Sequence, residues 1–534
     1  MTVRQAIFVF LISVTVLAVP LQIMIDPSPQ NCASACIVMA SCLSVLLYIF
    51  WSTALETHPL STFTLLGFSF TSQLGALLFQ TAAWTALSSS LYDPLYTFGT
   101  LAFYQGIALA VHSIYRFFSK QKPQGSVQKP GSVQPIRGLL TRVGLYRVPP
   151  VGTLWFMGFV GLCTFFFSHY DNVLGKVAGG FTFLAWAPFL IIFYLREVGE
   201  SYCNAAFNRG LLVAYAGVAI VLGLAFNTRS VMLQGAATIG LLYLLAGMRS
   251  NAPLMGGAVL KFAALVVVLL AVSVPVSDLA TSMVIARQWR GRVSAAEMIK
   301  TTLFIMGKPT LIASAHSHGE SAWRYGPYDE HYITNPLLNR LVVTKYHDNS
   351  FHFAGALTSE EARARLRAVS IKFAWAGLPT PVLAKLGIAV SKKDLAYSMG
   401  DYLGYLSRGL PLGGHKIGSM FAQGIALFGP LFPFVYAAIC LLLFWLIDLL
   451  TVRPVAGKAT LSTLGMLQIW LLFLAGISYE GLHIVLYFVF RNFWQTVIIY
   501  VLVCALARTM MPGSRSRVAA TTVPIWQRKL SQWN

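Results

Sequence analysis

Twelve apolar stretches constrain this chain more than any other feature of its sequence. An apolar helix of about 17–25 residues is long enough to cross the hydrocarbon core of a bilayer. Stretches of roughly that length lie at residues 6–24, 32–51, 62–87, 95–117, 151–167, 179–195, 211–226, 231–248, 257–278, 429–449, 461–478 and 482–507. Hydrophobic residues make up 56% of the chain and charged residues only 11%, against about a quarter charged in soluble domains, so a water-soluble enzyme is excluded. We predict an all-α polytopic membrane protein with about 12 transmembrane helices.

The basic residues predict how these helices are oriented. The linker 118–150 contains six Lys and Arg residues and the tail 508–534 contains five, and neither has an acidic residue. Short basic segments beside membrane helices stay in the cytoplasm, so both segments and both termini are expected there. The Gln, Pro, Gly and Ser repeats of the linker predict disorder. No small-residue cleavage site follows the first span, which we expect to be retained as a helix. The formal net charge of +21 thus reflects membrane orientation first, and nucleic acid is not an expected partner.

Each span takes the chain to the other side of the membrane, so counting spans from the cytoplasmic ends places the long segment before the last three spans outside. The chain then has six parts: helices 1–4 in residues 1–117, the basic linker 118–150, helices 5–9 in 151–278, a large outer loop with a juxtamembrane segment in 279–428, helices 10–12 in 429–507, and the basic tail 508–534. The outer loop is unlike the rest, because residues 279–412 hold nine of the eighteen acidic residues and sixteen basic ones. We predict a folded aqueous element with helices. Thr358-Ser359-Glu360-Glu361 is typical of a helix start, and the Leu366, Val369 and Phe373 that follow form one apolar stripe. We interpret this helix as lying on the membrane surface or on the spans, in preference to a direct role in substrate binding.

Arginines in or beside the apolar spans are the strongest candidates for function, since a cation at membrane depth costs about 3 kcal/mol or more. Arg491 lies about 15 Å into the last span, where it binds either a phosphate group or a carboxylate such as Asp448 or Glu480. If that span is one straight helix, Glu480 and Arg491 share a face about 16 Å apart. Arg229 lies in the four-residue turn Asn227–Ser230 between two spans, either extended to lipid headgroups or at the level of a lipid-linked pyrophosphate.

A third basic group is Arg408 to Lys416, where Gly409, Gly413 and Gly414 precede His415. Glycine lets a backbone approach a ligand closely. No strand pattern precedes this segment and its spacing fits neither a Rossmann nor a Walker loop, so we interpret it as a juxtamembrane segment lining a cavity. Asp401 and Glu480 are carboxylates near the membrane on the same outer side.

Metal binding is the less favoured interpretation of the histidines. His316-Ser317-His318-Gly319-Glu320 alternates possible ligands, but a third well-placed ligand is not evident, and hydrogen bonding to sugar hydroxyls or a structural role is favoured. No metal and no cofactor are predicted. The seven cysteines are spread along the chain, and we interpret them as small apolar residues.

The chain resembles the bacterial Wzy-type O-antigen and exopolysaccharide repeat-unit polymerases and, more distantly, the O-antigen ligases, which are polytopic glycosyltransferases of the GT-C type. The resemblance lies in about a dozen spans, cytoplasmic ends and one large outer loop before the last helices. Local support comes from Asn227-Thr228-Arg229-Ser230 and from Gly414-His415 through Phe428-Gly429. Members often have a Glu before the Phe-Gly step, where this chain has Gln423.

The resemblance implies a GT-C-like fold in the bacterial inner membrane with a periplasmic active site. It implies inverting, metal-independent transfer of a glycan from undecaprenyl pyrophosphate to a sugar hydroxyl of another lipid-linked unit. Guanidinium groups can stabilise the leaving pyrophosphate, and we expect Arg229, Arg491 and Arg408 in that role. The candidate proton acceptors are His415, Glu480 and Asp401. On the same interpretation, His316, His318, Arg324 and Arg340 bind the glycan. Partners would be the lipid-linked oligosaccharide, the bilayer and a chain-length regulator protein.

Two other functions fit the same pattern. An O-antigen ligase would share the chemistry and differ in acceptor. A transporter or flippase of a lipid-linked glycan or another anionic solute would also have 12 spans and intramembrane charges. Transporter folds are usually built from internal repeats, and no convincing repeat relates the two halves of this chain. The large outer loop on one side favours an enzyme.

Overall fold

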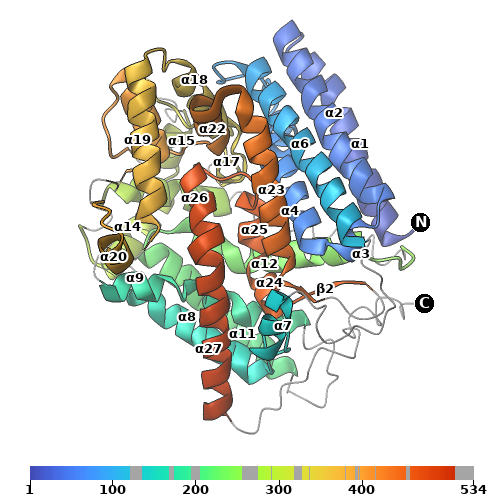
Figure 1. Ribbon diagram of the computed structural model, residues 1–534, viewed down its shortest axis with the longest axis vertical. Coiled ribbons are helices and arrows are strands. Elements are labelled where there is room, and N and C mark those ends of the chain that lie inside the picture. The colour runs from blue at the N-terminus through green and yellow to red at the C-terminus, as the bar shows by residue number, and fades with distance from the viewer. Residues whose placement is uncertain are drawn as a thin grey trace.

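The computed structural model describes residues 1–120, 135–167, 173–193, 205–254, 275–289, 292–317, 328–335, 337–378, 380–390, 395, 397–414, 416–452 and 458–511. It is an assembly of helices (Figure 1). Within the described residues, seven helical segments are long and apolar enough to cross a membrane. They are α1 (Val3–Ile25), α2 (Pro29–Trp51), α4–η1–α5 (Pro59–Ser69, Phe70–Leu74 and Gly75–Ala82), α11 (Ala205–Ala225), α12 (Arg229–Met248), α22–η4–α23 (Met420–Phe428, Gly429–Leu431 and Phe432–Asp448) and α26–η5–α27 (Leu482–Tyr487, Phe488–Asn492 and Phe493–Met510).

Other predicted spans have different forms. The span at 95–117 is the long helix α6 (Pro94–Lys120), and that at 151–167 is the shorter α8 (Val151–Phe167). The span at 179–195 corresponds to the shorter apolar helix Val177–Phe193, which includes the 3₁₀ segment η2 (Thr182–Leu190). The span at 461–478 is two short helices, α24 (Thr463–Leu467) and α25 (Ile469–Ala475). Most of 257–278 lies outside the described residues, so the count of twelve stays a prediction.

The remaining elements are short. They are α3 (Ala54–Thr57), α7 (Pro135–Arg142), α9 (Val173–Gly179), η3 (Arg287–Trp289), α14 (Ala295–Met306), α15 (Pro309–Ser317), α17 (Leu338–Leu341), α18 (Thr344–Gly355), α19 (Glu360–Ala376), α20 (Thr380–Lys385), α21 (Met399–Arg408), β1 (Thr451–Val452) and β2 (Thr460–Leu461). The strands β1 and β2 form an antiparallel pair, with Thr451 opposite Leu461.

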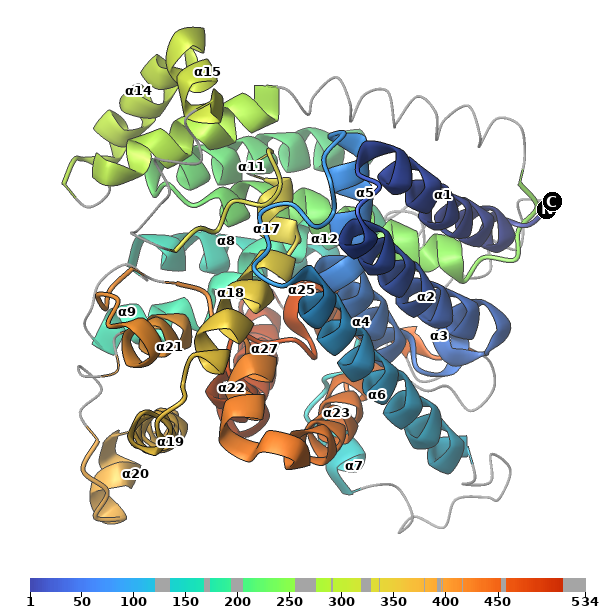
Figure 2. The same ribbon diagram turned by 90° about the horizontal axis from the view of Figure 1, so that it is seen from above.

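Segments that the predicted topology assigns to the same side of the membrane contact one another. On the side predicted as outer, the N–H of Tyr92 donates to Asp348 at 2.8 Å and the N–H of Met420 donates to the carbonyl of Tyr479 at 3.0 Å. On the side predicted as inner, the N–H of Ala459 donates to the carbonyl of Glu56 at 2.8 Å. Figure 1 shows α18, α19 and α22 gathered at one end and α3, α7 and β2 towards the other. Seen from above in Figure 2, α14 and α15 project at one corner and α19 and α20 at another.

The second half of the predicted disordered linker is ordered and begins with the short helix α7. Leu140 of α7 is buried at 3% exposure, and the Arg137 guanidinium donates to the carbonyls of Asp448 and Thr451. Tyr146 donates to the carbonyl of Leu449 at 2.8 Å. The prediction of disorder was wrong for these residues because the end of α23 offers carbonyls without helical partners, and the linker satisfies them.

The predicted outer helix is confirmed as α19. The Ser359 hydroxyl accepts a hydrogen bond from the N–H of Ala362, as expected of an N-cap. Leu366 and Phe373 are buried in a cluster with α18, α21 and the residues around them, and Val369 packs against that cluster. The apolar stripe therefore attaches α19 to the other helices of the outer segment.

Candidate functional site

A buried polar helix, α18, is the centre of the outer segment. From Thr344 to Ser350 every residue is buried, although the run Thr-Lys-Tyr-His-Asp-Asn-Ser contains no aliphatic side chain. Burial of polar groups is tolerated only where they are hydrogen-bonded. The hydrogen bonds of these polar side chains therefore fix α18 in place. The sequence did not indicate this buried helix, because a polar run without an apolar stripe is typical of a solvated loop.

The start of α18 is bound by a π-helical turn inside a membrane-length helix. The turn η1 interrupts the α-helical hydrogen-bond pattern at Phe70–Leu74. The carbonyl of Thr71 accepts from the N–H of Val343 at 2.9 Å, and the carbonyl of Ser72 accepts from the Thr344 hydroxyl at 2.8 Å. Because these bonds reach into the span 59–82, α18 is held against the membrane helices.

Asp348 fixes α18 to the beginning of α6. Its carboxylate accepts from the N–H groups of Tyr92 and Asp93 and from the Thr97 hydroxyl, at 2.8 to 3.1 Å. The Lys345 ammonium lies 3.1 Å from the same carboxylate, with side-chain exposures of 4% and 1%. A carboxylate at the first turn of a helix is favoured by the helix dipole, and here it joins the outer segment to a predicted span.

Three arginines gather next to α18. Arg229 is the first residue of α12, Arg287 follows the helix at 275–286, and Arg340 lies in α17. Burial lowers the pKa of Arg229 to about 10, and charge repulsion from Arg340 and Arg287 adds to this shift. The position of Arg229 is set by its neighbour Asn227, whose side chain donates to the carbonyl of Met283 at 2.9 Å. Chain segments distant in sequence thus place three cations together.

The arginines differ in their partners. Arg340 donates to the Tyr346 hydroxyl at 3.0 Å and lies 3.7 Å from the Glu330 carboxylate, which also accepts from Tyr328 at 2.8 Å. Within the part of the chain that the structure describes, Arg229 has no hydrogen bond and no carboxylate partner. Burial raises the pKa of Tyr346 to about 12, although the neighbouring Arg340 opposes that shift. The cluster therefore has one cation that is short of negative charge.

His347, the next residue of α18, faces the other way. Its Nδ1 is 2.8 Å from the Ser419 hydroxyl and its Nε2 is 3.3 Å from the Ser478 hydroxyl. Burial lowers the pKa of His347 to about 3, so the imidazole is neutral at physiological pH. The helix thereby connects the arginine cluster through Tyr346 to the segment 476–481 through His347.

Glu480 lies in that segment and is the more accessible of the two predicted proton acceptors that the structure describes. Its side chain reaches the surface, yet the surrounding protein removes enough water to raise the pKa of the carboxyl. Asp401 is different: its carboxylate is 3.2 Å from the Lys416 ammonium, with exposures of 0% and 1%, and caps the start of α21 through Ser398. These contacts count against Asp401 as a base. His415 lies outside the described residues.

The last span is not one straight helix, which corrects the expected geometry of Glu480 and Arg491. Gly481 is extended (φ −173°, ψ 155°) and the helix begins at Leu482, so Glu480 lies outside it. Arg491 belongs to the π-helical turn η5 and is exposed. Asp448 binds Ser61 at 2.9 Å, and no ion pair joins Arg491 to a described carboxylate. Gln423 donates to Ser370 at 2.9 Å and accepts from the N–H of Leu482 at 2.8 Å, so it positions the start of this helix.

The other predicted residues are spread more widely. Arg408 is exposed at the end of α21 and contacts the Nε2 of His352, whose ring stacks on Tyr92 with centroids 3.9 Å apart. It does not act on Arg229. Of the predicted glycan ligands, only Arg340 joins the arginine cluster; His318 and Arg324 lie outside the described residues, and only the backbone of His316, in α15, is described. Among the described residues no three His, Cys, Asp or Glu side chains gather closely enough to hold a metal ion.

The fold and this site define a polytopic helical membrane protein with a polar, arginine-rich centre in its long interhelical segment. Compared with known protein families, with curated proteins and with solved structures, the chain matches none. Sequence analysis missed Arg287, Glu330 and Tyr346, and the available signal was the density of charge between residues 287 and 348.

Proposed function

We propose that this protein polymerises lipid-linked oligosaccharide repeat units at the outer face of a bacterial inner membrane. It would transfer a glycan from undecaprenyl pyrophosphate to a sugar hydroxyl of a second lipid-linked unit, with inversion and without a metal. The observation that carries the proposal is the position of Arg229, a cation without a partner among the described residues, close to Arg287 and Arg340 at the start of a membrane-length helix.

The chemistry of the proposed reaction calls for such a cluster. When the glycosidic bond breaks, negative charge develops on the departing pyrophosphate, and groups that are already oriented stabilise it most effectively. Guanidinium groups bind phosphate oxygens through two N–H groups at once and keep their charge at physiological pH. Arg229 also lies at the N-terminus of α12, where backbone N–H groups and the helix dipole favour an anion.

The acceptor hydroxyl needs a proton acceptor, and we propose Glu480 for this step. A carboxyl group whose pKa is raised towards neutrality is a stronger base than an ordinary carboxylate. Its segment is joined through Ser478 and His347 to α18, which also carries Tyr346 of the arginine cluster. The proton would pass from the sugar hydroxyl to Glu480 as the new glycosidic bond forms, and the pyrophosphate would leave with its lipid.

The test compares two arginines of the same helical hairpin. Arg229→Gln removes the unpartnered cation, whereas Arg209→Gln removes an exposed arginine near the start of α11. Surface glycan from cells carrying each variant is separated by chain length. We expect Arg229→Gln to leave single repeat units and Arg209→Gln to retain long chains. Long chains from both variants would refute the assigned site.

The same strains separate the alternative functions. A deletion strain of a polymerase accumulates lipid-linked single units on the outer leaflet and still attaches single units to the cell surface. A flippase deletion would keep the units on the cytoplasmic leaflet, and a ligase deletion would leave polymer attached to the carrier lipid. Either of these two results would contradict the polymerase proposal.

A further inference from the structure

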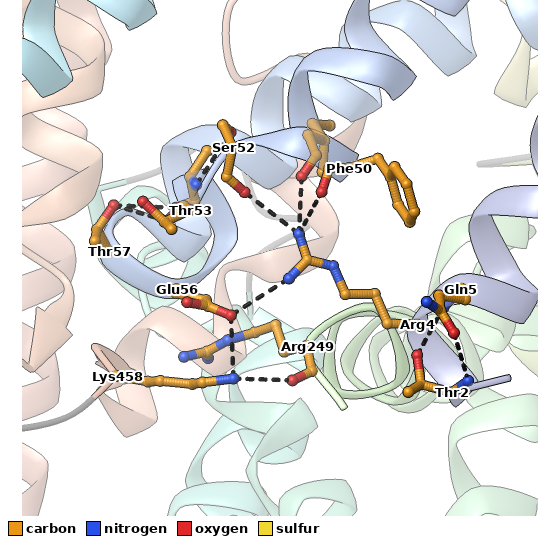
Figure 3. A network of polar contacts seen from close by, with 12 residues as sticks. Thr2, Arg4, Gln5, Phe50, Ser52, Thr53, Glu56, Thr57, Arg249 and Lys458 are labelled. Carbon is orange, nitrogen blue, oxygen red and sulfur yellow. Dashed lines mark hydrogen bonds and ion pairs between the residues drawn. The ribbon is translucent and has the colours of Figure 1, made fainter. Parts of the chain in front are cut away.

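A second basic cluster lies at the opposite end of α12. Figure 3 shows Arg4, Glu56, Arg249 and Lys458 drawn together from α1, α3, the end of α12 and the segment before β2. One Glu56 carboxylate oxygen is 3.3 Å from the Arg4 guanidinium and 3.1 Å from the Lys458 ammonium. Arg249 donates to the carbonyl of Ala459, and Lys458 donates to the carbonyl of Arg249 at 3.4 Å.

The cluster is short of negative charge. Three cations share a single carboxylate, so the formal charge of the cluster's described residues is positive by two. The Nη2 of Arg4 also donates to the carbonyls of Ile49, Phe50 and Ser52. Arg249 is buried at 4% exposure, and its Nε and Nη1 atoms have no hydrogen-bond partner among the described residues. A buried charged donor without a partner is destabilising, so an anion that reaches the cluster would be bound favourably.

Three side chains of the cluster reach the surface. The side chains of Lys458 and Glu56 are 34% and 23% exposed, and that of Arg4 is 16% exposed. The cluster lies where α1 begins and where α2 and α12 end, and Trp51 at the end of α2 is 75% exposed. Tryptophan concentrates at the headgroup level of bilayers, which places the cluster at that depth.

We propose that Arg4, Arg249 and Lys458 form a binding site for the phosphate group of an anionic phospholipid in the leaflet facing this end of the bundle. Lys458 and Arg4 would contact the phosphate, and its charge would also stabilise the buried Arg249. Basic sites between the ends of membrane helices are suited to such headgroups. The inference goes beyond the proposed function and does not depend on it.

Glu56 gives the proposal its sharpest test, because it occupies the position where a phosphate would compete. A Glu56→Gln variant keeps the size of the side chain and removes the competing charge, so we expect phospholipid binding to become about fivefold tighter. Lys458→Gln removes a surface cation of the site, and we expect binding about tenfold weaker. Lys372→Gln, on the exposed face of α19, removes the same charge elsewhere and should leave binding unchanged.

The full chain, purified in detergent, is mixed with phosphatidylglycerol or phosphatidylcholine, and bound lipids are counted by native mass spectrometry. The expected result is retention of phosphatidylglycerol over phosphatidylcholine in the order Glu56→Gln, wild type, Lys458→Gln. Equal retention of phosphatidylglycerol by the wild type and all three variants would overturn the proposal. The cluster would then only hold the helix ends together, and Glu56→Gln would lower the melting temperature. Displacement of phosphatidylglycerol by millimolar inorganic phosphate would overturn the lipid as ligand.

Discussion

The two ends of α12 carry the same kind of side chain in opposite electrostatic settings. Arg229 is the first residue of the helix and Arg249 is its C-cap. A helix of 20 residues is about 30 Å long, so the two arginines lie about that distance apart at its two ends. The helix dipole favours a cation at the C-terminus and opposes one at the N-terminus. Arg249 therefore lies where its helix stabilises it, and Arg229 lies where its helix does not.

The surroundings increase this difference. Near Arg249 the opposing charge comes from Glu56, which counteracts the effect of burial that lowers the pKa of Arg249 to about 10. Near Arg229 the strongest charges are two further arginines. Sites that bind or react often contain groups whose charges are poorly satisfied in the free protein. The comparison teaches that an arginine's role follows from its position on the helix and its neighbours.

The largest expected effect is that of Arg229→Leu. Polymer formation should fall about a thousandfold, as expected for loss of a group that stabilises a leaving anion. The melting temperature should not fall, because the substitution removes repulsion with Arg287 and Arg340. Glycan chain length and thermal unfolding in detergent measure the two quantities. If the variant unfolds at a clearly lower temperature, Arg229 has a structural role like that of a buried ion pair.

Replacement of Glu480 should give the next largest effect. Glu480→Gln is expected to slow transfer about a hundredfold, within the range typical of a general base. Since burial raises the pKa of the carboxyl above its ordinary 4.5, the wild-type rate should decline as pH falls through that raised value. The residual rate of the variant should lack this decline. An unchanged pH profile in the variant would assign the proton acceptor elsewhere.

Glu330→Gln tests the arginine cluster at the Arg229 end of α12 by removing a carboxylate and keeping the arginines. It removes the carboxylate that lies 3.7 Å from Arg340, as Glu56→Gln does for Lys458 and Arg4. We expect pyrophosphate to bind about fivefold more tightly to the purified protein, measured by titration calorimetry. Weaker binding would mean that Glu330 orients Arg340 for the ligand.

Arg491→Gln should have the smallest effect, a change of about threefold or less in polymer yield. Arg491 is exposed in η5 and is not among the charges that act on Arg229. The same assay of glycan chain length measures it beside Arg229→Leu. A loss as large as that of Arg229→Leu would show that the two residues serve one anion.

Much of the fold could be predicted because it follows from local patterns. Hydropathy predicted the long apolar helices, and the capping residues and apolar stripe predicted α19. The breaks in the helices were not predictable. The π-helical turn η1 occurs within an ordinary apolar run, and the carbonyls of its Thr71 and Ser72 accept hydrogen bonds from Val343 and Thr344, far along the chain.

The candidate site was predicted only in part for the same reason. Arg229 was chosen because a cation in a four-residue turn between spans is unusual in itself. The sequence ranks Asp401 just after Glu480 as a proton acceptor, and only the structure gives Asp401 a buried partner in Lys416.

By itself, the sequence determined that this is a membrane protein, where its apolar helices lie, and that basic residues accumulate in the linker, the tail and the outer segment. Hydropathy and helical periodicity act over a few turns, so they can be read along the chain. The tertiary structure decided which arginines meet, which carboxylates are already paired, and that a polar helix is buried at the centre. Those outcomes depend on contacts between residues far apart in sequence, because the free energy of a charge depends on its distance from every other charge and from water.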